Sequence, residues 1–111
     1  MKQNHYIYPA IFSYSTDGIS VAFPDILGCF TSGKTQEEAL KMAKEAMALH
    51  LIGLEQENFD IPAASSLKNL KTKANEATVL VDVWMPTFRQ EMNSLSVNET
   101  LSIPRWLISP K

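Results

Sequence analysis

Carboxylates are the side chains of this sequence most able to do chemistry, because several of them held close together can bind catalytic metal ions. They are poorly distributed for that role. The predicted first strand, residues 6–14, contains no Asp or Glu. Asp17 and Asp25 stand in predicted turns, where such residues usually bond to the backbone, and Asp82 alone stands within a predicted strand. The sequence therefore predicts neither a metal-dependent nuclease nor a bound cofactor.

The histidines and the cysteine offer no other catalytic centre. His5 is near the amino terminus, and His50 borders the apolar stripe of a predicted helix, where a core or boundary histidine is expected. No pair of His or Cys residues has the spacing of zinc ligands. Cys29 has no basic neighbour to activate its thiol, so it is expected to be a small buried hydrophobe. We therefore predict a protein that is not an enzyme.

The strongest structural signal is a helix over residues 35–57. Apolar residues recur there at helical spacing, namely Leu40, Ala43, Met47, Leu51 and Leu54. Thr35 and Glu38 form a capping box, in which the Thr35 hydroxyl bonds the Glu38 amide and the Glu38 carboxylate reaches back to Thr35. Glu37 and Glu38 also place negative charge in the first turn, where the helix dipole favours it.

Three strands are predicted before this helix, at residues 6–14, 19–23 and 29–32, because apolar and polar residues alternate there. Asp17-Gly18 supplies the tight turn that joins the first two. Pro9 favours an edge position or a bulge in the first strand. The aromatic and β-branched content of residues 6–14 predicts a strand with both faces at least partly covered.

A fourth strand is predicted at residues 77–85, followed by a short helix at 87–92 and a last strand at 94–103. This order predicts an α+β fold, in which three N-terminal strands and the fourth form an antiparallel sheet and one long helix packs across it. The last strand is an extension of that fold. We divide the chain into a domain of residues 1–93 and a C-terminal segment of residues 94–111.

The charge and composition limit the possible partners. The chain has 111 residues and a net charge of −2, which argues against broad, non-specific nucleic-acid binding. Residues 36–58 carry five Glu and two Lys, and they form the one acidic helix face expected. No apolar run approaches the ~20 residues of a membrane span. An unbridged cysteine fits the reducing cytoplasm, which is the expected location.

The predicted last strand allows a second kind of function. Asn98, Thr100 and Ser102 place short polar side chains on one of its faces. A two-stranded ribbon with such residues can read base edges in the major groove of DNA. The alternative is an edge strand whose outer face is polar.

Several motifs together resemble the HicB family of antitoxins, over nearly the whole chain. The first of these motifs is Asp60-Ile61-Pro62, followed closely by Ser65. The others are Phe23-Pro24-Asp25, Gly28-Cys29, Thr31, Gly33, Thr35, Glu37-Glu38-Ala39, Glu45-Ala46, Val79-Leu80-Val81-Asp82-Val83 and Thr100-Leu101-Ser102-Ile103-Pro104-Arg105-Trp106.

The resemblance implies a degenerate ribonuclease-H-like domain that lacks the metal-binding carboxylates. It also implies a type II toxin–antitoxin role, in which the antitoxin binds a small basic mRNA interferase of the HicA kind and masks its active site. Family members usually add a C-terminal DNA-binding module, often ribbon-helix-helix, that represses their own operon. Here residues 96–104 resemble the ribbon strand, but the two helices that should follow it are missing, which weighs against operator binding.

We therefore expect a homodimeric antitoxin that neutralises a HicA-like toxin without catalysis, metal or membrane attachment. A basic toxin would be attracted by acidic side chains on the helix and in the turns, namely Asp17, Asp25, Glu37, Glu45 and Glu55. The alternative is an operator-binding repressor that uses the C-terminal ribbon, namely Asn98, Thr100, Ser102 and Arg105. A third hypothesis is a scaffold whose edge strand dimerises.

Overall fold

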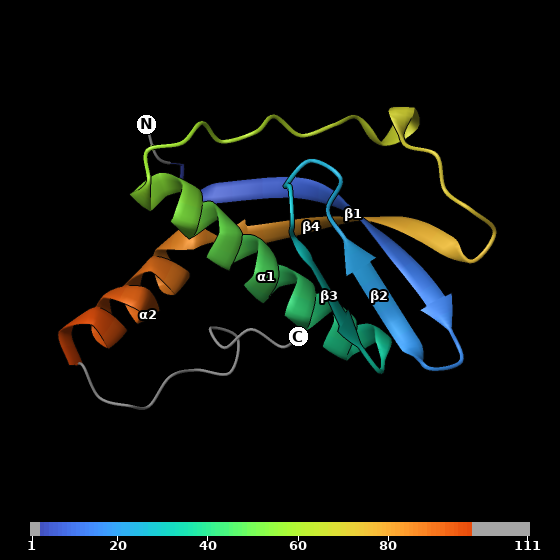
Figure 1. The fold of residues 1–111 in the computed structure, drawn as a ribbon, viewed down its shortest axis with the longest axis horizontal. Coiled ribbons are helices and arrows are strands. Elements are labelled where there is room, and N and C mark those ends of the chain that lie inside the picture. Colours follow the sequence, from blue (N-terminus) through green and yellow to red (C-terminus); the bar gives the residue numbers. More distant parts are fainter. Residues whose placement is uncertain (1–2, 99–111) are drawn as a thin grey trace.

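A computed structural model describes residues 3–98, and the side chains of residues 3–91 (Figure 1). Four strands form one antiparallel sheet in the order β3-β2-β1-β4, and a long helix crosses it, which confirms the predicted α+β fold. The elements are β1 (His5–Ser15), β2 (Gly18–Ala22), β3 (Phe30–Gly33), α1 (Gln36–Gln56), a 3-10 turn η1 (Leu67–Asn69), β4 (Glu76–Trp84) and α2 (Met85–Asn98).

The long first strand is the centre of the sheet. The β1–β2 hairpin closes at the pair Ser15↔Gly18, where Gly18 has a φ of 143° that favours glycine. β4 pairs with β1 over its whole length, from His5↔Trp84 to Ser13↔Glu76. β1 is an inner strand of the sheet, but Pro9 itself has the edge position that was one of the two expectations for it. The pairing of β1 with β2 begins only at Ile11, so β4 is the sole partner of β1 at Pro9.

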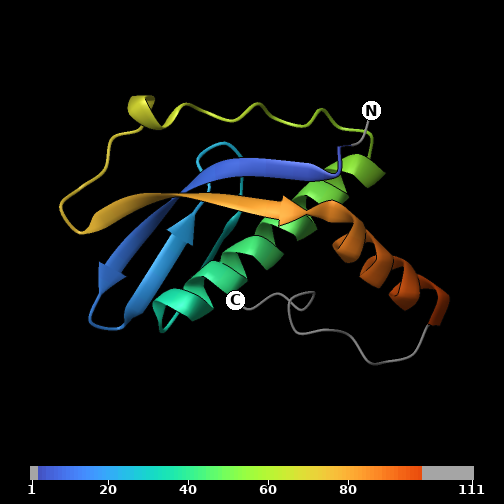
Figure 2. The ribbon, with the colours of Figure 1, turned by 180° about the vertical axis from the view of Figure 1, so that it is seen from behind.

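The core lies between α1 and one face of the sheet. Alternate residues of β1, from Tyr6 to Phe12, point into it and are at most 6% exposed. The helix lies in front of the sheet in Figure 1 and behind it in Figure 2. Further large core side chains come from β2, β4 and α1, namely Ile19, Val21, Val81, Val83, Met47, Leu51 and Ile52. The β2–β3 loop adds Phe23 and Ile26, and α2 adds Met85.

α1 begins with the predicted cap and packs tightly on β3. Thr35 Oγ1 accepts a hydrogen bond from the Glu38 amide at 3.1 Å. The Glu38 carboxylate, however, accepts from the amide of Lys34 at 2.7 Å and not from Thr35. A Cβ on Gly33 would stand 2.5 Å from the backbone nitrogen of Ala39, so only glycine allows β3 and α1 to approach this closely.

The carboxyl-terminal part of the prediction was wrong. α2 runs from Met85 to Asn98, so the short helix predicted at 87–92 is longer at both ends, and residues 94–98 are helical, not a strand. Phe88, Met92 and Leu95 recur at helical spacing, and the alternation in this segment was too short to exclude a helix. Residues 99–103 of the predicted strand lie outside the described residues. The boundary predicted between residues 93 and 94 falls within α2, and the domain division stays a prediction.

The second face of the sheet has no helix over it in the described part of the chain (Figure 2). Ile7, Leu80 and Trp84 lie on this face and are 46%, 54% and 56% exposed. Leu80 pairs with Pro9, Trp84 pairs with His5, and Ile7 pairs with Asp82, so Ile7 lies diagonally opposite both Leu80 and Trp84, with Asp82 between those two. We call these three residues the open-face patch.

Candidate functional site

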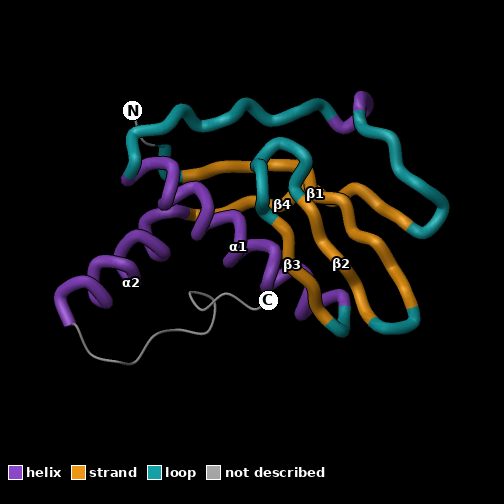
Figure 3. Tube along the Cα trace, in the orientation of Figure 1, coloured by secondary structure: helices purple, strands orange, loops and turns teal. Residues whose placement is uncertain are grey.

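A groove of about 600 Å³ lies beside the carboxyl-terminal half of α1. Its lining residues come from the second half of α1, from residues 57–62 directly after that helix, and from the β2–β3 loop. Figure 3 shows the backbone of these segments. Its wall is mostly apolar, with side chains from all three segments, namely Ile26, Leu27, Leu49, Leu54, Phe59 and Pro62. We call it the α1–loop groove.

Polar contacts fix the two loops that border the groove. The Asp25 carboxylate accepts hydrogen bonds from the Ser65 amide at 2.9 Å and from the Ser65 hydroxyl at 2.5 Å. The Tyr8 hydroxyl donates to the Pro62 carbonyl, and burial raises the pKa of Tyr8, so the phenol stays protonated and keeps this donor. The β2–β3 loop and the segment after α1 are therefore tied to the sheet and to each other.

The rim of the groove is acidic. Asp25, Glu57 and Asp60 line it, and no Lys or Arg is among its lining residues. His50 also borders it, and the His50 Nδ1 donates to the Ala46 carbonyl at 3.0 Å, which leaves Nε2 for the groove side. An apolar wall with a negatively charged rim suits a ligand that is apolar and positively charged.

The five acids predicted to meet a toxin are not brought into one cluster. Asp17, in the β1–β2 turn, and Glu37, in the first turn of α1, lie at the same end of the molecule, because the Tyr14 hydroxyl donates to Gln36 Oε1 at 2.7 Å.

Glu45 is half-buried midway along α1. Burial raises its pKa, Lys41 lowers it and Glu91 of α2 raises it. Asp25 lies in the β2–β3 loop and already holds Ser65.

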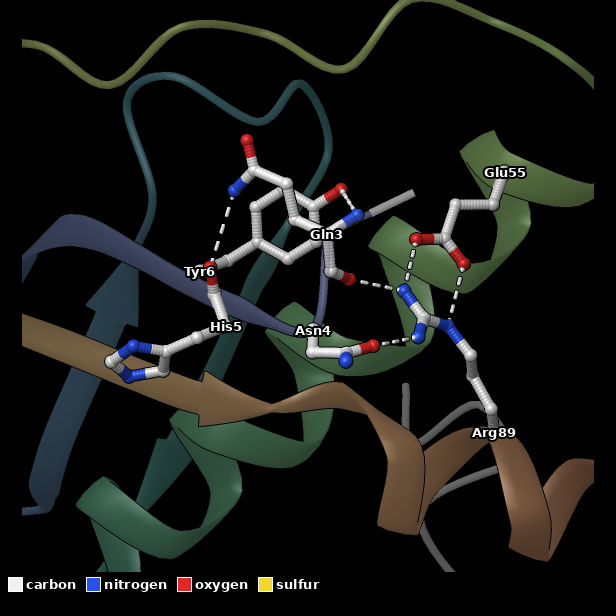
Figure 4. A network of polar contacts seen from close by, with 6 residues as sticks. All are labelled: Gln3, Asn4, His5, Tyr6, Glu55 and Arg89. Carbon is white, nitrogen blue, oxygen red and sulfur yellow. Dashed lines mark hydrogen bonds and ion pairs between the residues drawn. The ribbon is translucent and has the colours of Figure 1, made fainter. Parts of the chain in front are cut away.

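The expectation that Glu55 lies on an exposed helix face was wrong. Its side chain is 4% exposed and forms an ion pair with Arg89 of α2 at 2.7 Å. Arg89 also donates to Glu55 Oε1 at 3.1 Å, to Asn4 Oδ1 at 3.0 Å and to the Gln3 carbonyl at 2.5 Å (Figure 4). The hydrogen bond with Glu55 raises the pKa of Arg89 further. Glu55 therefore holds α2 and the amino terminus against α1.

This network was missed from the sequence, because Glu55 and Arg89 are 34 positions apart and neither stands in a motif. The groove was missed for the same reason. One local signal existed for it: Leu27 and Phe59 are apolar residues in segments that read as turns or loops. They are 98% and 62% exposed.

The residues that were weighed for catalysis are held in other roles. The Asp82 carboxylate accepts from His5 Nε2 at 3.1 Å and lies 3.7 Å from Lys44 Nζ. The bond from His5 and the charge of Lys44 hold the Asp82 pKa below its usual value. Cys29 is buried, and burial raises its pKa to about 12. Within residues 3–98, no three His, Cys, Asp or Glu side chains gather as metal ligands.

The predicted DNA-binding residues are mostly beyond the described part of the chain. Asn98 is the last residue of α2 and is therefore helical, not in a ribbon strand. Thr100, Ser102 and Arg105 lie outside the described residues. Within the described residues, no helix is both long and apolar enough to cross a membrane.

An antiparallel sheet with one helix-covered face, and an apolar groove beside that helix, define a small α+β domain with a surface suited to binding. The chain belongs to the family of HicB-like antitoxins of bacterial toxin–antitoxin systems, whose model matches residues 8–109. This confirms the resemblance found in the sequence.

Individual relatives agree with this family. The chain is 37% identical over 59 residues to Antitoxin HicB 2 of Photorhabdus laumondii, which is 53% of this chain and 42% of that protein. It is 34% identical over 62 residues to an uncharacterised 14.9 kDa protein of Haemophilus phage HP1, which is 56% of this chain and 47% of that protein. The matches therefore span less than half of the length of these two relatives.

Solved structures share the fold. A structure of the HicA3 and HicB3 toxin–antitoxin complex matches with a TM-score of 0.55 and 32% identity, over 70% of this chain and 95% of that chain. A toxin–antitoxin complex from Streptococcus pneumoniae matches with a TM-score of 0.70 and 24% identity, over 93% of this chain and 84% of that chain. The second match, at this identity, supports the fold alone.

Proposed function

We propose that this chain neutralises a HicA-type mRNA interferase by binding the toxin over its active site, and that it does no chemistry of its own. The observation that carries the proposal is the match to the HicB-like antitoxin family over residues 8–109. The 32% identity to a chain of the HicA3 and HicB3 complex supports a toxin of the HicA kind as the partner.

The chemistry of the described side chains favours binding over catalysis. A nucleophilic cysteine needs a lowered pKa, whereas burial raises the pKa of Cys29 to about 12. A catalytic carboxylate needs access to substrate and freedom to exchange its partners. Asp82 already pairs with His5 and Lys44, and Glu55 pairs with Arg89.

Steering by charge is the role that we propose for three of the predicted acids. Asp17 and Glu37 are exposed at one end of the molecule, and Asp25, which is partly buried, lies on the groove rim. Such charges raise the association rate of a basic partner and lose this effect in salt. Glu55 is left out of this set because its carboxylate is enclosed by Arg89.

The test of the antitoxin function is RNA cleavage by the HicA-like toxin encoded beside this gene, with the purified chain added in increasing amounts. We expect cleavage to stop near a one-to-one molar ratio, and a complex of both proteins to elute together in gel filtration. Full cleavage at excess chain, with no complex in gel filtration, would show that the chain is not an antitoxin of that toxin.

We also infer a homodimer and a cytoplasmic location. The open-face patch supports the dimer, because three large apolar side chains, Ile7, Leu80 and Trp84, are each about half exposed on one face of the sheet, around Asp82. Sedimentation equilibrium of the wild type and of Trp84→Lys tests it, and a monomeric wild type would contradict it. Operator binding is favoured by no described residue, because the ribbon strand predicted from residue 94 begins as helix.

A further inference from the structure

The α1–loop groove presents two large apolar side chains to water at its edge, although most of the apolar side chains of the domain are covered. Leu27 is 98% exposed and Phe59 is 62% exposed. Ordinary surfaces do expose single hydrophobic residues. Here the two flank the same concave surface, which already has an apolar wall. Exposed apolar residues around a groove mark an interaction site.

The backbone holds Leu27 in this exposed position. The Phe23 amide donates to the Cys29 carbonyl at 3.0 Å, and the Cys29 amide donates to the Ile26 carbonyl at 3.1 Å. Gly28 has a φ of 79°, which lets the loop turn immediately after Leu27. The loop is therefore ordered with its leucine outward, which reduces the entropy lost when a partner covers it.

Phe59 is held in a similar way by the end of α1. Asn58 takes a left-handed φ of 60°, and the Phe59 amide donates to the Leu54 carbonyl at 2.9 Å. This hydrogen bond closes the helix and directs the chain away from its axis. Both anchors of the groove are thus fixed by hydrogen bonds before any partner arrives.

The charge of the rim identifies the chemistry of the occupant. Glu57 and Asp60 are exposed, and their carboxylates bond to no other described residue. The open-face patch differs, because the acid within it, Asp82, is paired with His5 and Lys44, which leaves little net charge there. A positively charged partner is therefore attracted more strongly to the groove than to the open-face patch.

We propose that the α1–loop groove is where the toxin docks, through a segment whose apolar side chain covers Leu27 and Phe59 and whose lysines or arginines meet Glu57 and Asp60. This inference rests on the proposed antitoxin function. It adds the part of this chain that makes the contact and the chemistry of the toxin segment that fits it.

The experiment compares lysine substitutions inside and outside the groove. Leu27→Lys and Phe59→Lys remove apolar surface and add a repelling charge at side chains that already face water, so the fold should persist. Leu67→Lys makes the same change in η1, at a side chain that is 44% exposed and lies outside the groove. Trp84→Lys makes it in the open-face patch. Circular dichroism checks that each variant is folded.

We expect each groove variant to weaken toxin binding by about 30-fold or more, the size of an interface hot spot, and to raise the amount of chain needed to stop RNA cleavage. Leu67→Lys and Trp84→Lys should bind within about threefold of the wild type, as changes outside an interface do. Wild-type binding by the groove variants would overturn the inference but leave the antitoxin function intact. A wild type that neither binds nor inhibits would instead refute the proposed function itself.

A second pair of variants tests the rim charge. Glu57→Gln with Asp60→Asn should slow association and make it less dependent on salt. The comparison pair is Asp17→Asn with Glu37→Gln, which removes two charges at the other end of the molecule, where they steer the toxin from a distance without contacting it. We expect this pair to slow association less than the rim pair does. A larger effect of the comparison pair than of the rim pair would place the docking site at that end and overturn the inference.

Discussion

Arg89→Met should destabilise the domain strongly, although Arg89 lies on the last helix of the described residues. The substitution keeps much of the side chain's length and removes the charge that faces Glu55. Four hydrogen bonds are lost, two of them to a carboxylate that is 4% exposed. Removing one partner of a buried ion pair reduces the free energy of unfolding by about 3–5 kcal/mol, because the remaining charge stays buried without a partner.

The lower end of that range applies here. The Arg89 side chain is itself 21% exposed, so water can reach part of the site when the guanidinium is gone. We expect a loss of about 3 kcal/mol in the free energy of unfolding, which lowers the Tm by roughly 15 °C for a domain of this size. α2 cannot simply detach to relieve the charge, because Met85 in its first turn is fully buried.

The assay is urea unfolding followed by circular dichroism, for Arg89→Met, Glu55→Met and the double variant. The double variant should recover about 2 kcal/mol relative to the sum of the single losses, because no buried charge remains unpaired. Lys44→Met is the control, since its pair with Asp82 spans 3.7 Å between side chains that are 42% and 56% exposed, and it should cost below about 1 kcal/mol. If Arg89→Met lost no more free energy of unfolding than Lys44→Met, the reasoning would be refuted. It would also be refuted if the loss in the double variant equalled the sum of the two single losses.

Two further perturbations test the packing and the charges. Gly33→Ala should reduce the free energy of unfolding by about 1–3 kcal/mol and lower the Tm, because the added Cβ would stand 2.5 Å from the Ala39 nitrogen. Gly53→Ala in α1 is the control: its Cβ would meet nothing within 4 Å, so it should raise the free energy of unfolding by about 0.5–1 kcal/mol. The Asp82 pKa is lowered first by the hydrogen bond from His5 and then by Lys44. Its charge therefore stabilises the fold above the ordinary carboxyl pKa, and this stability is lost as the pH falls through the lowered value. Asp82→Asn should thus flatten the acid side of a Tm-against-pH profile, and an unchanged profile would contradict the assignment.

Local patterns in the sequence determined most of the elements. The strands, predicted at 6–14, 19–23, 29–32 and 77–85, each lie within one residue of the observed bounds, and the long helix has the Thr35 cap that was expected. These predictions succeeded because strand alternation, turn residues and helix caps act between residues close in the sequence. The family resemblance depended on motifs of the same local kind, and it was confirmed.

The carboxyl-terminal segment shows where local patterns fail. Residues 94–98 alternate like a strand and also fit one more turn of a helix, and a short window cannot separate the two periods. Helix α2 is continuous from the buried Met85, with Phe88 packed against the core. Met85 and Phe88 therefore fix the first turns of α2 against the domain, and residues 94–98 continue the helix that begins there.

The sequence by itself determined the elements, the family and the absence of carboxylates from the first strand. Only the tertiary structure decided what the individual acids do. Glu55 reads as an exposed helix acid, yet it is enclosed by Arg89 from 34 positions away, and Asp25 reads as a turn residue, yet it holds Ser65 from 40 positions away. The groove likewise forms from α1, the residues directly after it and the β2–β3 loop. Burial and pairing depend on which distant segments the fold brings together, and no local period in a sequence contains that information.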